Sequence, residues 1–445
     1  MLPRRLGGLS AAVSGRLRRG LSTGAAASRP PWAMIYHAIL VKSPGLRASF
    51  KLAEPPCASH IFVPDHLVDP APRPDPDSDT MSLLGGVVRA VSGDGLLLLD
   101  FRDERATAPI VGYRGTSPLR RLMGFSNMDP DTTRFVCNPL SGQLFRLPDI
   151  DGTKKTSSYK WFGILTRSER LHGPPDRYAV AELVEDNEGM EGSFLMRRFL
   201  SPTRVWDKLV GLPSPLPVAR RSHENHDHEV LAFAGRLWWV DVSWGAITAD
   251  PFSDRPELQF VELPKGSLTE PVEGNEIRTL GRYRRMGVSE GRLHYAEVSQ
   301  EEPFLLSTFV LDDDGSWTLQ HRVALNRFLS HPSDLCEEDN KPRIGVVDPL
   351  NASIMHLTIG NNAISVDMIR RKVSEMNWSI YDGLGGFIFF GGMHLLVDDA
   401  TTPSSHRDFG ALLALTASTS LETLVQFDQD KIAILLYWHV AKSED

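Results

Sequence analysis

Short runs in which apolar and polar residues alternate dominate the chain, and Gly, Pro, Asn and Asp separate these runs from one another. Because successive side chains of a β-strand point to opposite faces of a sheet, this period of two indicates half-buried antiparallel strands. Tyr178–Val184 and Leu195–Phe199 are two examples. Helical periodicity is scarce, so the pattern predicts an all-β fold.

Turn residues support the pairing of neighbouring strands. The segment Asp312-Asp313-Asp314-Gly315 separates Leu305–Leu311 from Trp317–Ala324. An Asp-Gly pair supplies the positive φ that a tight hairpin turn requires. In the second arm, the alternation predicts one face made of Trp317, Leu319, His321 and Val323.

The tryptophan-rich segment 238–244 follows the same alternation. Its apolar face is predicted to hold Trp238, Val240, Val242 and Trp244, opposite Asp241 and Ser243. Half-buried strands of this kind stack sheet on sheet, so we expect Trp238 to pack between two neighbouring sheets.

A tight turn followed by apolar residues and an acid recurs along the chain. It appears at Gly95, Gly235 and Gly291, and in a weaker form at Gly386. Glycine to glycine, the spacings are 140, 56 and 95 residues. These spacings are close to three, one and two units of about 50 residues, which is the length of a kelch-type propeller blade.

A second repeated pattern is a strand, an Asx-Pro turn and another strand. Phe135–Leu147 aligns with Gly345–Leu357 at a distance of 210 residues, or about four such units. The two repeats predict a β-propeller-like domain over residues 82–445, with six or seven four-stranded blades. The alternative is an irregular protein of several sheets in which these matches are coincidental.

The N-terminal segment differs in composition from the rest of the chain. Residues 1–33 hold six arginines and no acid, with leucines between the arginines. An Arg-rich, Ser/Ala-rich, acid-poor start is typical of an organelle transit peptide. We therefore expect a disordered targeting segment at 1–33. The alternative is a basic tail on a cytosolic or nuclear protein.

The mitochondrion is favoured over the chloroplast for two reasons. Arginine dominates the segment, and Arg18-Arg19-Gly20-Leu21-Ser22 resembles a matrix-processing site. Cleavage is expected after about residue 21 or residue 33. Residues 34–81 are then predicted to hold an N-terminal strand and a linker, since 69–80 contain four prolines and four aspartates.

Charge and hydropathy exclude several classes of protein. The formal net charge is −8, and removal of the six N-terminal arginines leaves −14. An acidic surface disfavours nucleic acid as a partner. Two short basic stretches with aromatic residues, 154–161 and 282–285, are the weak exceptions. No apolar run approaches the 18 or so residues that a membrane-spanning helix needs.

The segment 223–229 is the obvious place to look for a metal site. His223, His226 and His228 lie close together there, but the spacing matches no compact ligand motif and no cysteine accompanies it. A solvated polar loop explains the segment better. We therefore predict no metal, no cofactor and no catalytic residue, with these three histidines as weak metal candidates only.

Other chemical motifs are equally weak. Gly383–Gly386 and Gly391-Gly392 lack the Lys-Ser/Thr of a phosphate-binding loop, and no Gly-x-Ser-x-Gly elbow is present. Isolated cysteines are expected in core or loop positions, and acidic clusters in solvated turns. The cysteines are Cys57, Cys137 and Cys336, and the acidic clusters are Glu182–Glu191, Asp312–Asp314 and Glu337–Asp339.

The segment 228–264 resembles the core motif of a known family. Gly235-Arg236-Leu237-Trp238-Trp239-Val240-Asp241, then Gly245, then Leu263-Pro264, is similar to the pattern of the grass-expanded plant family of domain of unknown function 1618. Pro30-Pro31-Trp32 resembles the opening of many members. The block around Asn138-Pro139 is also similar to plant F-box-associated and kelch-like propellers, although no F-box precedes it.

The resemblance implies a plant protein with a propeller-like fold and a binding role, and it implies no catalytic residue. We therefore expect a mitochondrial, non-enzymatic propeller that acts as a scaffold or adaptor for another protein. Two alternatives stay open. One is a metal-dependent propeller hydrolase or lactonase. The other is an F-box-less relative of plant substrate receptors in the cytosol or nucleus.

The first testable prediction concerns the N-terminal segment. Residues 1–33 fused to a fluorescent reporter should carry it into mitochondria, because import requires a basic amphipathic leader. Replacing Arg4, Arg5, Arg16, Arg18 and Arg19 by Glu should leave the reporter in the cytosol. A cytosolic reporter with the native segment would show that the transit-peptide interpretation is wrong.

Overall fold

The structure is a computed structural model, and it describes the chain in segments. The described residues are 32–36, 40–43, 45–53, 55, 58–64, 73–74, 80–107, 131–153, 161–169, 175–186, 192–216, 229–269, 275–327, 341–359, 362–379, 387–390, 422–426 and 433–437. Residues 1–31 and most of the Pro/Asp-rich segment 69–80 lie outside them.

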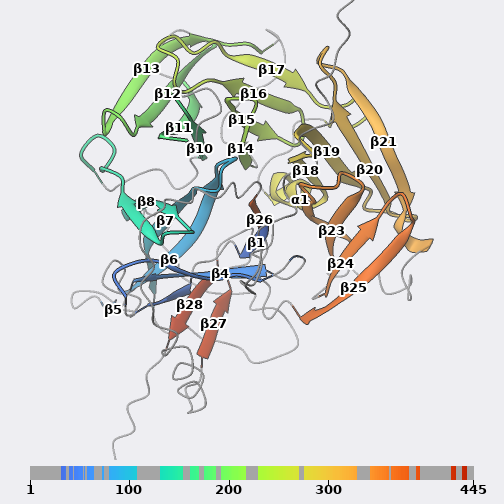
Figure 1. The fold of residues 1–445 in the computed structure, drawn as a ribbon, viewed down its shortest axis with the longest axis horizontal. Helices are drawn as coiled ribbons and strands as arrows, with labels where there is room; N and C mark the ends of the chain where they lie inside the picture. The colour runs from blue at the N-terminus through green and yellow to red at the C-terminus, as the bar shows by residue number, and fades with distance from the viewer. Residues whose placement is uncertain are drawn as a thin grey trace, which may run out of the picture.

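In the described part of the chain, six β-sheets form a ring, and each sheet is one blade of a β-propeller (Figure 1). Blades 3 to 6 are four-stranded, antiparallel and continuous in sequence. Blade 3 contains β10 (Phe162–Arg167), β11 (Arg177–Glu185), β12 (Ser193–Leu200) and β13 (Val205–Pro213). Blade 4 contains β14 (Glu229–Phe233), β15 (Arg236–Asp241), β16 (Gly245–Ala249) and β17 (Gln259–Glu262).

The next two blades repeat this order. Blade 5 contains β18 (Arg284–Ser289), β19 (Arg292–Val298), β20 (Leu305–Leu311) and β21 (Trp317–Ala324). Blade 6 contains β22 (Arg343–Val347), β23 (Ile354–Ile359), β24 (Asn362–Asp367) and β25 (Lys372–Ser379). Helix α1 (Asn275–Tyr283) precedes blade 5, and the 3-10 turn η2 (Leu325–Arg327) follows it.

Blades 1 and 2 depart from four antiparallel strands. Blade 2 has five antiparallel strands: β5 (Arg73–Pro74), β6 (Thr80–Val91), β7 (Leu97–Thr107), β8 (Asp131–Asn138) and β9 (Gln143–Arg146). Blade 1 contains β1 (Ala33–Tyr36), β2 (Leu40–Ser43), β3 (Ser49–Lys51), β4 (Ala58–Pro64) and the distant β26 (Phe387–Phe390). β1 pairs antiparallel with β26 but parallel with β4, so blade 1 is a mixed sheet.

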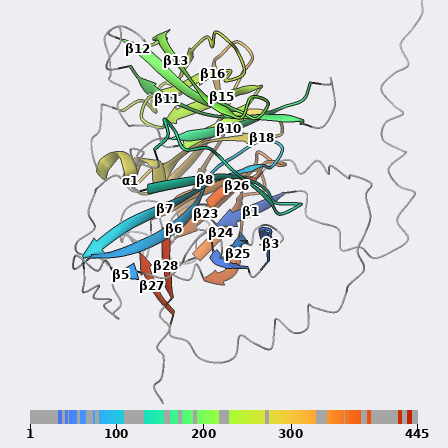
Figure 2. The same ribbon diagram turned by 90° about the vertical axis from the view of Figure 1, so that its left-hand side faces the viewer.

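The predicted all-β propeller is therefore confirmed, with six blades. The strands of blade 1 come from distant parts of the chain, and this explains why no continuous antiparallel meander forms there. A two-stranded hairpin, β27 (Glu422–Gln426) and β28 (Ala433–Tyr437), lies outside the ring near β6 (Figures 1 and 2).

The apolar core is divided among the boundaries between blades. Five clusters of buried side chains fill the boundaries from blade 1–blade 2 round to blade 5–blade 6. The cluster between blades 4 and 5, for example, joins Trp238 and Val240 of β15 to Leu293 and Tyr295 of β19. The expectation that Trp238 packs between sheets is confirmed.

The first repeated pattern marks equivalent turns. The turns at Gly95, Gly235 and Gly291 each join the first two long strands of a blade, and each glycine has a positive φ. The fourth copy is different, because β26 follows Gly386 directly and pairs with β1 rather than forming such a hairpin. Three of the four matches therefore describe a true structural repeat.

The second repeated pattern does not mark equivalent positions. The Asn138-Pro139 turn joins β8 to β9, the last two strands of blade 2. The Asp348-Pro349 turn joins β22 to β23, the first two strands of blade 6. The alignment is wrong as a blade repeat because an Asx-Pro turn is local chemistry that can close either hairpin of a blade.

The strand predicted through Trp244 ends at Asp241. Asp241 Oδ1 accepts hydrogen bonds from the Ser243 N–H (2.8 Å) and hydroxyl (2.6 Å), which caps a turn into β16. Asp241 and Ser243 were expected on a polar face, yet both are buried. Because this segment lies between two blades, both of its faces are covered.

The predicted hairpin at 312–315 is confirmed. The Gly315 N–H donates to the Asp312 carbonyl at 3.0 Å, and β20 pairs with β21 on either side. The predicted apolar face of β21 is only partly correct, since Leu319 is 44% exposed. The pairing of β20 with β21 is irregular there, because Thr308 lies opposite His321 but the next residue, Phe309, lies opposite Leu319. This irregularity interrupts the alternation of inward and outward side chains along β21.

Replacing Trp238 by Ala tests the packing between blades 4 and 5. We expect a loss of about 3–5 kcal/mol in the free energy of unfolding, as for other large-to-small changes in a core. Chemical denaturation measures it. Leu319→Ala is the matched control and should cost less than about 0.5 kcal/mol, as exposed sites do. Equal losses in the two variants would contradict the packing assignment.

Candidate interaction face

One side of the ring collects the turns between first and second strands and between third and fourth strands. In an antiparallel four-stranded sheet these two turns lie at the same end. We call this side the hairpin face. Its described turns include 92–96, 138–143, 234–235, 250–258, 290–291, 312–316, 348–353 and 367–371.

Four turns of the hairpin face share one local geometry. In each, an Asx side chain accepts a hydrogen bond from the N–H two residues later, and that later residue is apolar. The donor–acceptor pairs are Leu140–Asn138 (2.9 Å), Phe252–Asp250 (2.9 Å), Leu350–Asp348 (2.8 Å) and Ile369–Asp367 (3.1 Å). The backbone of each turn therefore holds an apolar residue in a fixed position.

These four apolar side chains differ in exposure. Phe252 packs under the guanidinium of Arg167, which lies 4.5 Å from its ring. Leu350 and Ile369 of blade 6 are instead 55% and 68% exposed. The Met368 N–H donates to the Ser353 carbonyl at 2.9 Å, which joins their two turns. Blade 6 thus presents two exposed aliphatic side chains on adjoining turns.

Further apolar side chains are exposed on the same side of the ring. Leu46, which is 86% exposed, lies two residues before Ala48. The Ala48 N–H donates to the Gly142 carbonyl at 2.9 Å, so this segment lies against a turn of the hairpin face. Val205, 57% exposed, follows the turn between β12 and β13.

Hydrogen bonds connect the turns of neighbouring blades. Thr166 at the end of β10 donates to Asp94 of blade 2. Arg167 pairs with Asp250 of blade 4 at 2.9 Å. The Glu290 N–H of blade 5 donates to the Pro349 carbonyl of blade 6 at 2.7 Å. These contacts fix the turns relative to one another, so the face is a preorganised surface.

A second set of contacts lies near the ring axis, where β10, β14, β18 and β26 are innermost (Figure 1). The Glu229 carboxylate of β14 accepts the Met286 N–H at 2.9 Å and lies 3.6 Å from the Arg285 guanidinium. Arg285 also donates to the Gly345 carbonyl of β22. One carboxylate and one guanidinium therefore connect blades 4, 5 and 6.

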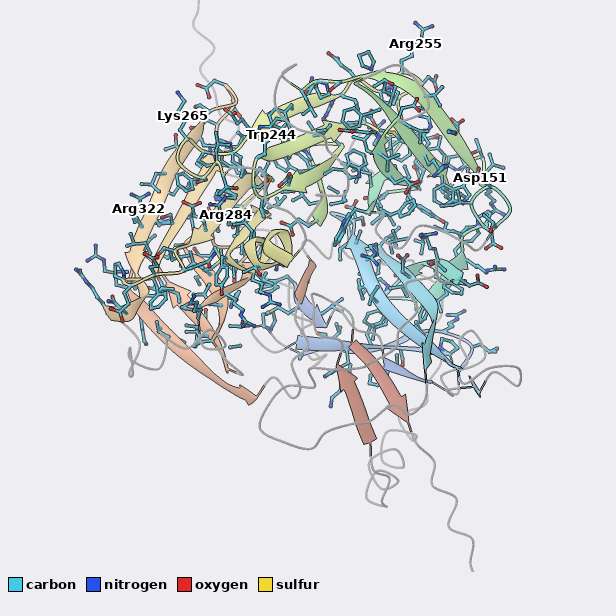
Figure 3. The ribbon with its side chains drawn as sticks, turned by 180° about the vertical axis from the view of Figure 1, so that it is seen from behind. Asp151, Trp244, Arg255, Lys265, Arg284 and Arg322 are labelled. Atoms are coloured by element: carbon cyan, nitrogen blue, oxygen red, sulfur yellow. The ribbon has the colours of Figure 1, made fainter. Side chains whose placement is uncertain are left out.

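The basic stretch 282–285 supplies contacts within the ring. Tyr283 is buried, and Arg284 donates to the Val242 carbonyl at 3.0 Å and to the Ser267 carbonyl. Figure 3 shows Arg284 beside α1, toward the centre of the ring, whereas Arg255 lies on its outer rim. The structure thus uses Arg284 and Arg285 to join blades.

Two acidic residues are buried between blades 2 and 3. Asp100 lies 3.0 Å from Arg89 and 3.3 Å from Arg134. Glu182 lies 3.0 Å from its cross-strand neighbour Arg197. The expectation of a solvated turn was wrong for Glu182, which is in the middle of β11 and fully buried. A buried carboxylate requires such a partner, and its removal would leave an unpaired charge.

The other sequence-based candidates divide into those inside and those outside the described residues. Cys137 is buried, and burial raises the pKa of its thiol to about 12, as for an inert core cysteine. No group of three His, Cys, Asp or Glu in the described segments could hold a metal ion. The remaining candidates lie outside the described residues: they are His223, His226, His228, Cys57, Cys336 and the segments 154–160, 337–339, 383–386 and 391–392.

No described helix is long and apolar enough to cross a membrane. Helix α1 has nine residues, which is about half the length that a membrane-spanning helix needs.

The family comparison agrees with the resemblance inferred from the tryptophan-rich motif. Residues 239–356 match the family model described as "Protein of unknown function (DUF1618)". The matched stretch runs from β15 of blade 4 to β23 of blade 6. This part of the chain is similar to the DUF1618 family. No curated protein matches the sequence.

Several solved structures are similar to this chain. They include the Cps50 (Swd1) β-propeller domain of Myceliophteria thermophila, at 10% identity and a TM-score of 0.31, covering 69% of this chain and 86% of that one. A putative 6-phosphogluconolactonase of Bacteroides fragilis is 11% identical with a TM-score of 0.28, and the match covers 71% of this chain and 99% of that one. The periplasmic gluconolactonase PpgL of Pseudomonas aeruginosa is 10% identical with a TM-score of 0.32, and the match covers 81% of this chain and 99% of that one. At these values the likenesses carry no argument about activity.

The buried His294 gives a test by pH. Burial, together with the nearby positive charge of Arg292, lowers the pKa of His294 to about 4. The unfolded chain, with a histidine pKa near 6.5, then binds more protons than the folded chain below that pH. The His294 contribution to stability should therefore be complete above about pH 6.5 and decrease as the pH falls toward 4.

Denaturation midpoints between pH 7 and pH 4 measure this effect. His294→Leu should flatten part of the pH dependence, because the titrating group is gone. Leu319→Ala, which changes an exposed residue on β21 that does not titrate, is the control and should keep the wild-type slope. The same slope in all three proteins would contradict the assignment.

Proposed function

We propose that this protein is a non-enzymatic interaction propeller that binds another protein through the hairpin face. The observation that carries the proposal is the pair of exposed aliphatic side chains, Leu350 and Ile369, on adjoining turns of blade 6. Exposed apolar side chains held in fixed positions are a feature of protein interaction sites.

The local structure supports a binding role for these turns. Asp348 accepts hydrogen bonds from the backbone N–H groups of Leu350 and Asn351. Asp367 accepts the same pair of bonds from Ile369 and Arg370. A surface that is already ordered loses little conformational entropy on binding, so a small apolar contact yields more affinity. Arg370 pairs with Asp367 of the same turn at 3.4 Å, whereas Arg371, exposed nearby, adds positive charge at the rim and favours an acidic partner.

We also propose that the protein acts in mitochondria. The acid-free, Arg-rich composition of residues 1–33 supports this destination. The partner is then a resident protein of that compartment, and the ring serves as a scaffold or adaptor.

The test compares partners captured by two variants of the full chain. Leu350→Asp with Ile369→Asp should abolish the capture of the specific partner, because two charges replace the apolar contact. Leu319→Asp is the matched control, since Leu319 is also exposed but lies within strand β21 of blade 5 and not on the two turns of blade 6. Quantitative mass spectrometry of the captured proteins measures the difference, and thermal unfolding verifies that both variants stay folded.

Two outcomes would contradict the proposal. The first is that the double variant retains the same partners at the same level as the control. The second is that elemental analysis finds about one metal ion per chain, lost on replacing His223, His226 and His228 by Ala. That result would favour the metal-dependent hydrolase instead.

A further inference from the structure

Strand β1 is the strand that completes the ring. It pairs antiparallel with β26 over four residue pairs, from Ala33–Phe390 to Tyr36–Phe387. On its other edge it pairs in parallel with β4, through Met34–Ala58 and Ile35–Ser59. Removal of β1 would therefore separate β26 from the other strands of blade 1.

The side chains of this segment reach the blades on either side. Trp32, immediately before β1, is 5% exposed, and its ring lies 5.6 Å from that of His356 on β23 of blade 6. Ile35 is fully buried in the cluster that contains Val88 and Leu99 of blade 2. Five residues thus contact both neighbours of blade 1.

His356, which contacts Trp32, is itself held in place by a neighbouring carboxylate. His356 is buried, and its Nε2 lies 3.5 Å from the carboxylate of Asp348. Asp348 is held in turn by the Leu350 and Asn351 N–H groups. The contact of Trp32 with blade 6 therefore rests on a side-chain pair with a fixed position.

We infer that residues 32–36 belong to the functional propeller and that processing of the Arg-rich N-terminal segment ends upstream of Trp32. The processing part of this inference rests on the proposed mitochondrial destination. Of the two cleavage positions suggested by the sequence, cleavage after Leu21 leaves Trp32 and β1 intact. Cleavage after Ala33 removes Trp32 and the first residue of β1, and with them the contact to blade 6.

The inference excludes one position for the mature N-terminus and corrects the boundary that composition alone suggests. The acid-free composition, which includes Arg29, continues to the Pro30-Pro31 pair before Trp32. Trp32, the first residue that the structure describes, is already buried. A leader that leaves the domain intact must therefore end before Trp32.

The experiment measures thermal unfolding of the full chain and of two shortened chains, 22–445 and 34–445. We expect 22–445 to melt at the same temperature as the full chain and 34–445 to melt at least about 5 °C lower, as for loss of a core aromatic residue. Equal melting temperatures for 22–445 and 34–445 would overturn the inference.

Point variants keep the test informative if 34–445 does not fold. In the full chain, Trp32→Ala should lower the melting temperature by a similar amount, and Trp32→Phe should restore most of it by refilling the contact with His356. Leu46→Ala, at an exposed position, is the control and should leave the temperature unchanged. A full-chain Trp32→Ala variant as stable as this control would contradict the inference.

N-terminal sequencing of protein recovered from mitochondria tests the processing step. A mature N-terminus between residues 2 and 32 supports the inference, and one at Ala33 or later overturns it. If the full chain is not imported, the proposed destination fails, but the thermal measurements still decide whether residues 32–36 complete the ring.

Discussion

The ring depends on the packing of each blade against its two neighbours. A propeller has no single central core, and the buried side chains of this protein form separate clusters at successive blade boundaries. Each sheet must therefore be apolar on both faces, unlike a sheet with one solvated face. This requirement explains why Asp241 and Ser243, on the face opposite Trp238, are buried as well.

Hydrogen bonds at the blade boundaries also fix how neighbouring blades are oriented relative to each other. Trp206 at the start of β13 donates to the Pro148 carbonyl of blade 2 at 2.8 Å, and Trp317 at the start of β21 donates to the Glu262 carbonyl of blade 4 at 2.7 Å. Both tryptophans lie near the start of the last strand of their blade, in blades 3 and 5. An indole buries a large apolar area and still satisfies its N–H, so it suits a boundary that is apolar inside and wet at the rim.

The charged residues that join the blades lie apart from the exposed apolar residues of the hairpin face. Arg284, Arg285 and Glu229 lie in the inner part of the ring, where they join blades 4, 5 and 6. Leu350 and Ile369 on the hairpin face lie in turns that are held by their own Asx hydrogen bonds, so their side chains are not used to join blades. Because the blades hold these turns in place, their tips can present apolar side chains to a partner.

The sequence by itself determined the local features of this protein. Alternation of apolar and polar residues predicted the strands, Asp-Gly and Gly-Arg-Leu segments predicted the hairpins, and their spacing predicted blades, because each depends on a few neighbouring residues. It also located the Asx-Pro turns at Asn138 and Asp348. It did not show that these turns, with those at Asp250 and Asp367, gather on one face.

Only the tertiary structure decided what depends on distant contacts. The pairing of Ala33 with Phe390 completes blade 1, and nothing in either short segment specifies the other as its partner. Glu182 looked like the start of a solvated acidic turn, yet it is buried because blade 2 covers its face of blade 3. The exposure of Leu350 and Ile369, in contrast to Phe252, is likewise set by whether a neighbouring blade supplies a covering side chain. Sequence patterns report the conformation of a strand or turn, whereas burial depends on which other segments lie against it.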